Sequence, residues 1–453
     1  MADRWRWPIW ALVAYIPLSG IPILALYPDA SVPVLLKDFA FVIPAYVLFG
    51  LSAYLRRSSI TFSGAPTALF LALGVLVVLQ ALNPALPNRL VGAIGIKVWL
   101  FYVPLYFLGY HFVRNRRDLS RLLALAALTA LLPALIGIGE AALFRAGQEA
   151  FVYRLYGDAA GPATQSFTAL ELPGGAVIRR VPSTFSSWTQ YYAFLATMAA
   201  LTYAWWRGSL GGTRRGPLGL AVWLVVLAAA LLSGARVAFV FVPALIVLTL
   251  ALERLPLRRA ASPRIRTTFA VMLVPAVAVA LAALLLGAGV RDIAGATLEK
   301  ASSELTGTFA ARFRDALEIT WTGLGAGIDT IASRYAFSSP DQFAGVGGGW
   351  YESWWVKVVL ELGIPGLLLV AALFGVILVN GVRQQLRLRD PKLSAISAAI
   401  LAFLALTVLA GTGKPYLDYD PINVFFWLLA GVLAKIPRLE PSAAEAGDDP
   451  ALR

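Results

Sequence analysis

The segment GGGWYESWWVKVVLELGIPG at residues 347–366 runs directly into LLLVAALFGVILV at 367–379. The apolar stretch 351–379 exceeds the roughly 20 residues that a helix needs to cross a bilayer. Near its start it carries Glu352, Lys357 and Glu361. Charged groups at membrane depth are costly unless they are paired or face water, so they predict a functional site at the mouth of this helix. The four-residue spacing of Lys357 and Glu361 predicts that they pair on one helix face.

The composition is that of a membrane protein with many spans. Of the 453 residues, 59% are hydrophobic and 14% are charged, and the mean hydropathy is +0.74. A soluble domain has roughly 25% charged residues. The net charge is +13, but the basic residues lie in short clusters between apolar runs, which indicates membrane topology rather than nucleic-acid binding. The absence of cysteine excludes disulfides and thiolate metal sites.

The apolar runs predict an all-α fold of about twelve transmembrane helices in one domain, residues 1–436. A polar tail at 437–453 is expected to be disordered and cytoplasmic. The basic, aromatic start MADRWRW leads into an uncleaved first span. The predicted spans are 8–27, 33–55, 65–82, 91–111, 121–144, 190–206, 217–233, 236–252, 267–289, 351–379, 393–411 and 421–436.

The distribution of basic residues predicts the orientation. If the N-terminus is inside, every cytoplasmic segment holds at least two lysines or arginines. The short external turns near Asp29, Ser233 and Gly411 are nearly free of them. By the positive-inside rule, this pattern predicts an even number of spans with both termini in the cytoplasm.

Two predicted external segments are long, at about 145–189 and 290–350. The second, between spans nine and ten, has apolar residues at helical spacing, so we expect amphipathic helices on the outer surface. A loop of this length is usually functional. The apolar positions are Leu298, Leu305, Phe309, Phe313, Leu317 and Trp321.

Several basic residues on the predicted outer side are not required by topology. Arg236, in LLSGARVAFV, stands at the mouth of two closely joined spans and predicts an anion-binding role; membrane snorkelling or helix capping is the alternative. Arg312 and Arg314 lie on the expected outer helix, where a solvated charged face is an equal alternative. Arg179 and Arg180, just before VPSTF, leave the same two interpretations open.

Other charged residues near external helix ends have simpler explanations. Lys97, and the adjacent Lys37 and Asp38, are interpreted as snorkelling side chains. Asp418 and Asp420, in LDYDP, have the DxD spacing of metal-dependent glycosyltransferases, but turn capping is the favoured interpretation. Phosphate-loop, HExxH and GxSxG motifs are absent from the sequence, and we expect neither a metal nor a cofactor.

The predicted outer face therefore combines arginines with a carboxylate at a helix mouth. Guanidinium groups bind phosphate oxygens in bidentate fashion, which suits a pyrophosphate carried by a lipid at the membrane surface. External aromatic residues would stack on sugars or, equally, form an interfacial belt. They are Trp188, Tyr191, Tyr192, Trp350, Tyr351, Trp354 and Trp355.

Along most of its length the chain resembles the superfamily of bacterial inner-membrane O-antigen ligases and O-antigen or exopolysaccharide polymerases, which are GT-C-like. Ligases of this superfamily typically carry a His-Asn pair nine residues before the Glu of an ExG motif. Here Glu352 and Ser353 occupy those positions, which favours a polymerase. The motifs that carry the resemblance, in this order, are LLKDFAF, NP with GAIGIKVWLFYVPL, RRVPSTFSSWTQYYAFL, LLSGARVAFV, ARFRDALEITWTGLGAG and ESWWVKVVLELGIPGLLL.

The resemblance implies an inner-membrane glycosyltransferase of lipopolysaccharide or exopolysaccharide biosynthesis. It would move an oligosaccharide from undecaprenyl pyrophosphate to a sugar hydroxyl of another lipid-linked unit, on the periplasmic side, without metal. Arg236, Arg180 and Arg312, with Arg314 beside them, would neutralise the pyrophosphate. Glu352 would orient or deprotonate the acceptor. Supporting residues would be Lys357, Glu361 and Lys97.

Three alternatives stay open at this point. Within the family, the chain would be a ligase that joins the glycan to lipid A core or another acceptor. In another class, it would be a transporter or flippase of the same lipid-linked sugars, although its polar residues gather at helix ends rather than at the membrane midplane. In a third class, it would be a scaffold for other polysaccharide-assembly proteins. Those proteins are also possible partners of an enzyme, and no nucleic-acid partner is expected.

Overall fold

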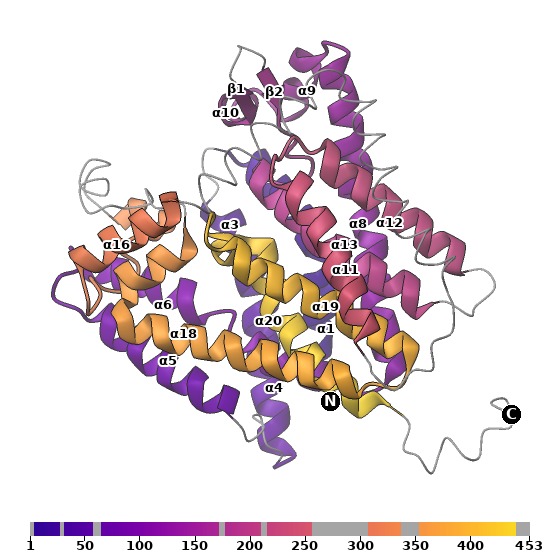
Figure 1. Ribbon diagram of the computed structural model, residues 1–453. Helices are drawn as coiled ribbons and strands as arrows, with labels where there is room; N and C mark the ends of the chain where they lie inside the picture. The colour runs from indigo at the N-terminus through magenta and orange to yellow at the C-terminus, as the bar shows by residue number, and fades with distance from the viewer. Residues whose placement is uncertain are drawn as a thin grey trace, which may run out of the picture.

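A computed structural model describes residues 4–27, 31–57, 65–171, 177–209, 215–255, 307–336 and 353–440. These residues are predominantly helical (Figure 1). In length and composition, six of the described helical segments suffice to cross a membrane, and two shorter apolar helices lie at Ala65–Ala81 and Gly216–Leu232. The helical fold predicted from the sequence is confirmed, and these segments have the length and composition expected of a membrane protein. The six long segments are Val32–Leu55, Arg89–Phe112, Arg116–Arg145, Trp354–Arg387, Pro391–Ala410 and Asp420–Leu439.

The elements of the first half are α1 (Arg6–Tyr15), η1 (Ile16–Leu18), α2 (Gly20–Ala25), α3 (Ser31–Lys37), the π-helical turn η2 (Asp38–Val42), α4 (Ile43–Leu55), α5 (Ala65–Ala81), α6 (Arg89–Leu100), α7 (Leu105–Phe112), α8 (Arg116–Arg145), α9 (Glu149–Leu155), α10 (Ala160–Thr168), β1 (Ala169–Glu171) and β2 (Val177–Arg179). The later elements are α11 (Trp188–Gly208), α12 (Arg215–Leu232), α13 (Ala238–Arg254), α16 (Phe309–Ile319), η4 (Ile331–Ala336), α18 (Trp354–Arg387), α19 (Pro391–Ala410), η5 (Tyr416–Asp418), α20 (Asp420–Lys435) and η6 (Ile436–Leu439).

Six of the described segments reach membrane-crossing length, so the count of twelve spans stays a prediction. The ninth, 267–289, lies outside the described residues. The first predicted span consists of α1, η1 and α2; the α-helix ends at Tyr15, just before Pro17, and resumes at Gly20. In the long predicted external segment 145–189, strands β1 and β2 pair antiparallel, with Ala169 opposite Arg179.

Helix α11 forms the centre of the bundle. All its residues from Tyr191 to Trp206 are buried, and it packs against α8, α12 and α19. Helix α20 packs closely on α7, where Gly109 lies against the backbone of Leu428 and Gly431 against that of Tyr106. Glycines at such crossings allow two helix backbones to approach, as membrane helices commonly do.

Helix α16 lies over the start of α18 (Figure 1). Its apolar side, with Phe309, Phe313 and Ala316, packs on Val356 and Leu360. The structure therefore has an amphipathic helix where the spacing of Phe309, Phe313 and Leu317 predicted one. Leu298 and Leu305 lie outside the described residues.

Helix α18 is interrupted at Gly363, whose φ of 67° is not helical. The loop after α16 is hydrogen-bonded to the backbone on both sides of this break. Leu324 N donates to Leu360 O at 2.7 Å, and Ile364 N donates to Trp321 O at 2.9 Å. Backbone groups released by a break in an apolar helix need such partners, since lipid offers none. The loop 320–330 is thereby fixed beside the first turns of α18.

Segments predicted to be cytoplasmic contact one another. Arg6 pairs with Asp118 at 2.7 Å, and Arg116 pairs with Asp390 at 2.6 Å. Gln385 donates to Leu252 O at 3.0 Å. These contacts bring four separate predicted inner segments together at one end of the bundle; on which side of a membrane that end lies stays a prediction.

Candidate functional site

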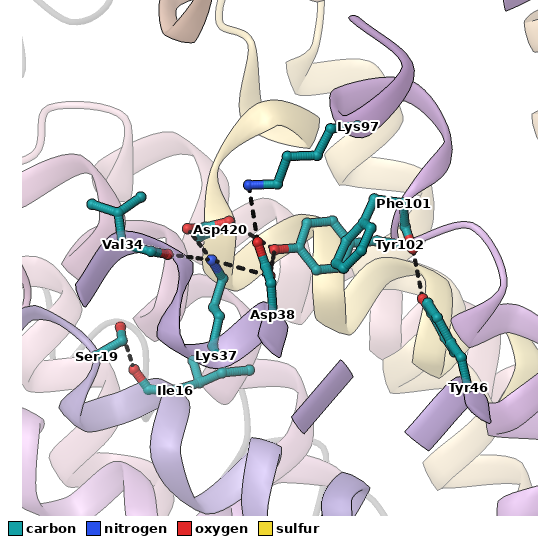
Figure 2. Close-up of polar contacts among 10 residues, drawn as sticks. All are labelled: Ile16, Ser19, Val34, Lys37, Asp38, Tyr46, Lys97, Phe101, Tyr102 and Asp420. Atoms are coloured by element: carbon teal, nitrogen blue, oxygen red, sulfur yellow. Dashed lines mark hydrogen bonds and ion pairs between the residues drawn. The ribbon is translucent and has the colours of Figure 1, made fainter. Parts of the chain in front are cut away.

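A buried ion cluster lies where α3 meets the π-helical turn η2 (Figure 2). Lys37 Nζ is 2.8 Å from Asp420 Oδ2 and 3.5 Å from Asp38 Oδ1. Asp38 Oδ2 pairs with Lys97 Nζ at 2.9 Å, and Tyr102 donates its hydroxyl proton to Asp38 Oδ1 at 2.6 Å. Two lysines and two aspartates from three distant parts of the chain thus neutralise one another.

This cluster is closed on one side and open on the other. The side chains of Lys37 and Asp38 are 4% and 3% exposed, whereas those of Lys97 and Asp420 are 39% and 35% exposed. The snorkelling interpretation of Lys37 and Asp38 is wrong, because their charges are neutralised inside the bundle and do not reach out to water. Lys97 is the lysine of the cluster that a group from solvent or lipid can reach, and Asp420 is accessible on the same open side.

A second buried network surrounds the first turns of α18. Lys357 Nζ is 2.5 Å from Asp418 Oδ2, and the indole of Trp354 donates to Asp418 Oδ1 at 3.2 Å. The predicted pairing of Lys357 with Glu361 is therefore wrong. Asp418 comes from the turn before α20 and reaches Lys357, while the Glu361 side chain is taken by other donors.

The Glu361 carboxylate is fully buried and accepts four hydrogen bonds. Its donors are the Trp99 indole at 2.6 Å, Gly327 N at 2.7 Å, Asp329 N at 3.0 Å and the Thr330 hydroxyl at 3.0 Å. Donors that already point at a charge replace its lost hydration. Glu361 therefore holds α6, α18 and the loop 327–330 together, which fits the supporting role expected for it.

Trp99 and the LDYDP turn join the two networks. Lys357 Nζ lies 5.2 Å from the centre of the Trp99 ring, and Trp99 is two residues from Lys97. Asp418 and Asp420 belong to the same turn but reach different lysines. The DxD interpretation is not supported by this arrangement, since each carboxylate has its own ammonium partner, and ion pairing rather than turn capping explains both residues.

The predicted anion-binding residues Arg180 and Arg236 lie in two segments that contact each other. The α12–α13 turn, which contains Gly234 and Arg236, lies against the chain that leads into α11. Val181 N donates to Ser233 O at 3.0 Å. Gly234 has φ +75°, and a side chain there would come within 2.7 Å of Arg179 O. The structure therefore brings the backbones that carry Arg180 and Arg236 together.

The side chains of the three arginines in this region differ in their contacts. The Arg180 guanidinium stacks on Trp188, 4.1 Å from the ring centre. Arg179 pairs with Glu149 at 2.7 Å, and this hydrogen bond raises the pKa of Arg179. The side chain of Arg236 is half-buried and, within the described part of the chain, makes no ion pair or hydrogen bond. Arg236 is therefore the arginine best prepared to accept an anion.

The remaining predicted residues lie elsewhere or are not described. Arg312 is half-buried and Arg314 exposed on α16, which Figure 1 places well apart from β2 and α9. The structure thus places both near α18 rather than beside Arg180. Glu352 lies outside the described residues. It directly precedes Ser353, whose hydroxyl caps α18 by accepting from Val356 N at 3.4 Å.

A buried carboxylate that the sequence interpretation missed supports the entry to α11. Glu140, in α8, accepts from the Tyr156 hydroxyl at 2.5 Å and from Ser183 N at 3.0 Å. Ser183 has a φ of +52°, which is unusual for a non-glycine residue. Burial, and then the Glu140 charge, raise the pKa of Tyr156, so this phenol stays protonated and remains a donor. A lone Glu inside a predicted span was the available signal.

Comparison with protein-family models and with curated proteins finds no match for this chain. Its class therefore rests on the fold and on the site. It is a helical chain with several apolar helices of membrane-crossing length, two buried ion networks and an arginine pair at the entry to α11.

Proposed function

We propose that this protein is a membrane glycosyltransferase that polymerises lipid-linked oligosaccharides. The donor would be a glycan on undecaprenyl pyrophosphate, and the acceptor a hydroxyl of another lipid-linked unit, as in assembly of an O-antigen or exopolysaccharide. In this proposal the chain crosses the bacterial inner membrane twelve times, with both termini in the cytoplasm and the site on the periplasmic side.

One observation carries the proposal. The backbones of Arg180 and Arg236, more than fifty residues apart in sequence, are in contact at the ends of α11, α12 and α13. Two guanidinium-bearing segments at the ends of apolar helices suit an anion that is attached to a lipid. The tryptophan stacked on Arg180 adds a flat apolar surface beside that anion.

The proposed reaction needs charge neutralisation more than bond activation. The acceptor oxygen would form a bond to the anomeric carbon while the bond from that carbon to pyrophosphate breaks. The pyrophosphate leaves with the electron pair, and its charge would be stabilised by Arg180 and Arg236. Arg312 and Arg314, on α16, lie apart from this pair and take no part in the step proposed here. Glu352 would take the acceptor proton, and attack opposite the leaving group inverts the anomeric carbon. Neither metal nor cofactor is required in this scheme.

The test is chain growth by the purified full-length protein in liposomes that contain lipid-linked oligosaccharide. Wild type is expected to produce longer glycans. Arg236→Gln is expected to lower the rate roughly 100-fold or more, since loss of one donor to a developing anion has that effect. Arg121→Gln is the matched control, because Arg121 is exposed at the opposite, predicted cytoplasmic end. Equal rates in wild type and Arg236→Gln would refute the proposed site.

A ligase remains the nearest alternative, and the same assay separates it: transfer to lipid A core without chain growth would identify a ligase. A transporter is favoured by one specific observation, the burial of Lys37, Asp38 and Lys357, because ionisable groups inside membrane bundles often serve transport. Movement of labelled lipid between leaflets with no glycan growth would replace the polymerase proposal with this one.

A further inference from the structure

A pocket opens at the predicted cytoplasmic end of the bundle, far along α8 from the proposed site. Its rim is polar and consists of Arg116, Ser120, Ser209 and Lys392. Its wall is apolar and includes Leu119, Leu123, Trp205 and Ile396. The rim residues come from the first turns of α8 and α19 and from the end of α11, so three helices build the pocket together.

The charge of the rim is positive after its ion pairs are counted. Arg116 is held by Asp390 at 2.6 Å and donates to Leu439 O at 3.0 Å. The side chain of Lys392 is exposed and, in the part of the chain that is described, has no ion-pair partner. The other nearby carboxylates are already engaged: Asp118 with Arg6, Glu253 with Arg207, and Glu440 with the backbone N–H groups of residues 389 and 390.

An apolar path leads from this rim along α8. From Ser120 onward, positions four residues apart continue through Ala124 to Leu128 and Leu132 on one ridge of the helix. Leu128 and Leu132 are 53% and 49% exposed, and Leu135 on the next turn is 55% exposed. A membrane-crossing helix presents such a stripe to lipid tails.

From this arrangement we propose that the pocket binds the phosphate-bearing headgroup of an anionic phospholipid. Lys392 and Arg116 would contact the phosphate, and the hydroxyls of Ser120 and Ser209 would bind the remaining headgroup oxygens. The acyl chains would lie along the Leu128–Leu132 stripe. A soluble phosphate compound shares the headgroup chemistry but would leave this stripe unused, so the lipid is the occupant that fits both parts of the pocket.

The test is native mass spectrometry of the full-length protein with phosphatidylglycerol, compared with phosphatidylcholine. Wild type is expected to retain phosphatidylglycerol in preference. Lys392→Gln is expected to bind it about fivefold more weakly, the effect of one basic residue near a lipid surface. Lys392→Arg should keep the binding. The control is Arg121→Gln, which removes an exposed charge that directly follows Ser120 but does not line the pocket, and it should bind like wild type.

Three results would overturn the proposal. Unchanged binding by a folded Lys392→Gln protein would show that the pocket is not the site. Equal losses in Lys392→Gln and Arg121→Gln would show only general surface attraction. Displacement of the lipid from wild type by millimolar inorganic phosphate would assign the pocket to a soluble anion. Thermal unfolding of each variant in the same detergent establishes that it is folded.

Discussion

At the scale of single residues, the buried carboxylate of Glu361 is held by four hydrogen-bond donors. Its two carboxylate oxygens accept from Trp99, Gly327, Asp329 and Thr330. Glu361→Gln replaces one acceptor oxygen by an NH₂ group that faces donors. We expect a loss of about 1–3 kcal/mol in the free energy of unfolding, the cost of a buried polar group without its partner.

The measurement is thermal or denaturant unfolding of the protein in detergent micelles. Glu318→Gln is the matched control, since Glu318 is exposed on α16, and its change is expected to fall within about 0.5 kcal/mol of wild type. If the Glu361→Gln protein were as stable as the Glu318→Gln protein, the four contacts would not fix the loop 327–330.

The Lys357–Asp418 pair allows a second residue-scale prediction. Removal of one partner, by Lys357→Met or Asp418→Asn, leaves a buried group without its counter-ion and is expected to cost about 3–5 kcal/mol. The double variant removes both charges, so its loss should be clearly smaller than the sum of the two. Additive losses in the double-mutant cycle would show that the two side chains do not interact in the folded protein.

At the scale of elements, the break in α18 depends on Gly363. Its φ is 67°, and a side chain there would overlap the backbone of Thr322. Gly363→Ala is expected to destabilise the protein by at least about 1–2 kcal/mol, from left-handed backbone strain alone. Gly375 lies in the same helix with open space around it. Gly375→Ala should therefore be neutral or stabilise by up to about 1 kcal/mol. Similar unfolding temperatures for the two variants would contradict the assigned break.

The elements themselves were predictable where a simple period governs them. Apolar runs located α8, α18 and α19, and the spacing of Phe309, Phe313 and Leu317 located α16. The π-helical turn at Asp38 and the break at Gly363 were not predicted, because each depends on contacts with residues far away in the sequence. In the second case the GIPG sequence at 363–366 was an unused signal, since glycine and proline together often interrupt helices.

At the scale of the whole molecule, two networks connect α3, α6, α18 and α20. The sequence showed that Lys357, Glu361 and Lys97 were unusual but not which groups they meet. Trp99 and Glu361 are 262 residues apart, and Tyr102 and Asp420 are 318 apart. No local pattern predicts such pairs, because they depend on how the helices pack. The neighbouring positions of Arg180 and Arg236, by contrast, were expected, since both were placed at external helix ends.

The last prediction concerns which residues of the proposed topology can be labelled from outside the cell. Because the chain has no cysteine, a single introduced cysteine gives an unambiguous signal with a membrane-impermeant maleimide. The side chains of Arg145 and Arg314 are exposed at the proposed outer side. Arg145→Cys and Arg314→Cys should therefore be labelled in intact cells whose outer membrane is permeable to the reagent. Arg117→Cys and Lys392→Cys, equally exposed at the opposite end, should be labelled only after the inner membrane is broken. Arg145 and Arg117 are joined by α8 alone, so labelling of both in intact cells would mean that this helix does not cross the membrane. Labelling of Arg314→Cys only in broken cells would instead place α16 inside and require an even number of spans before it.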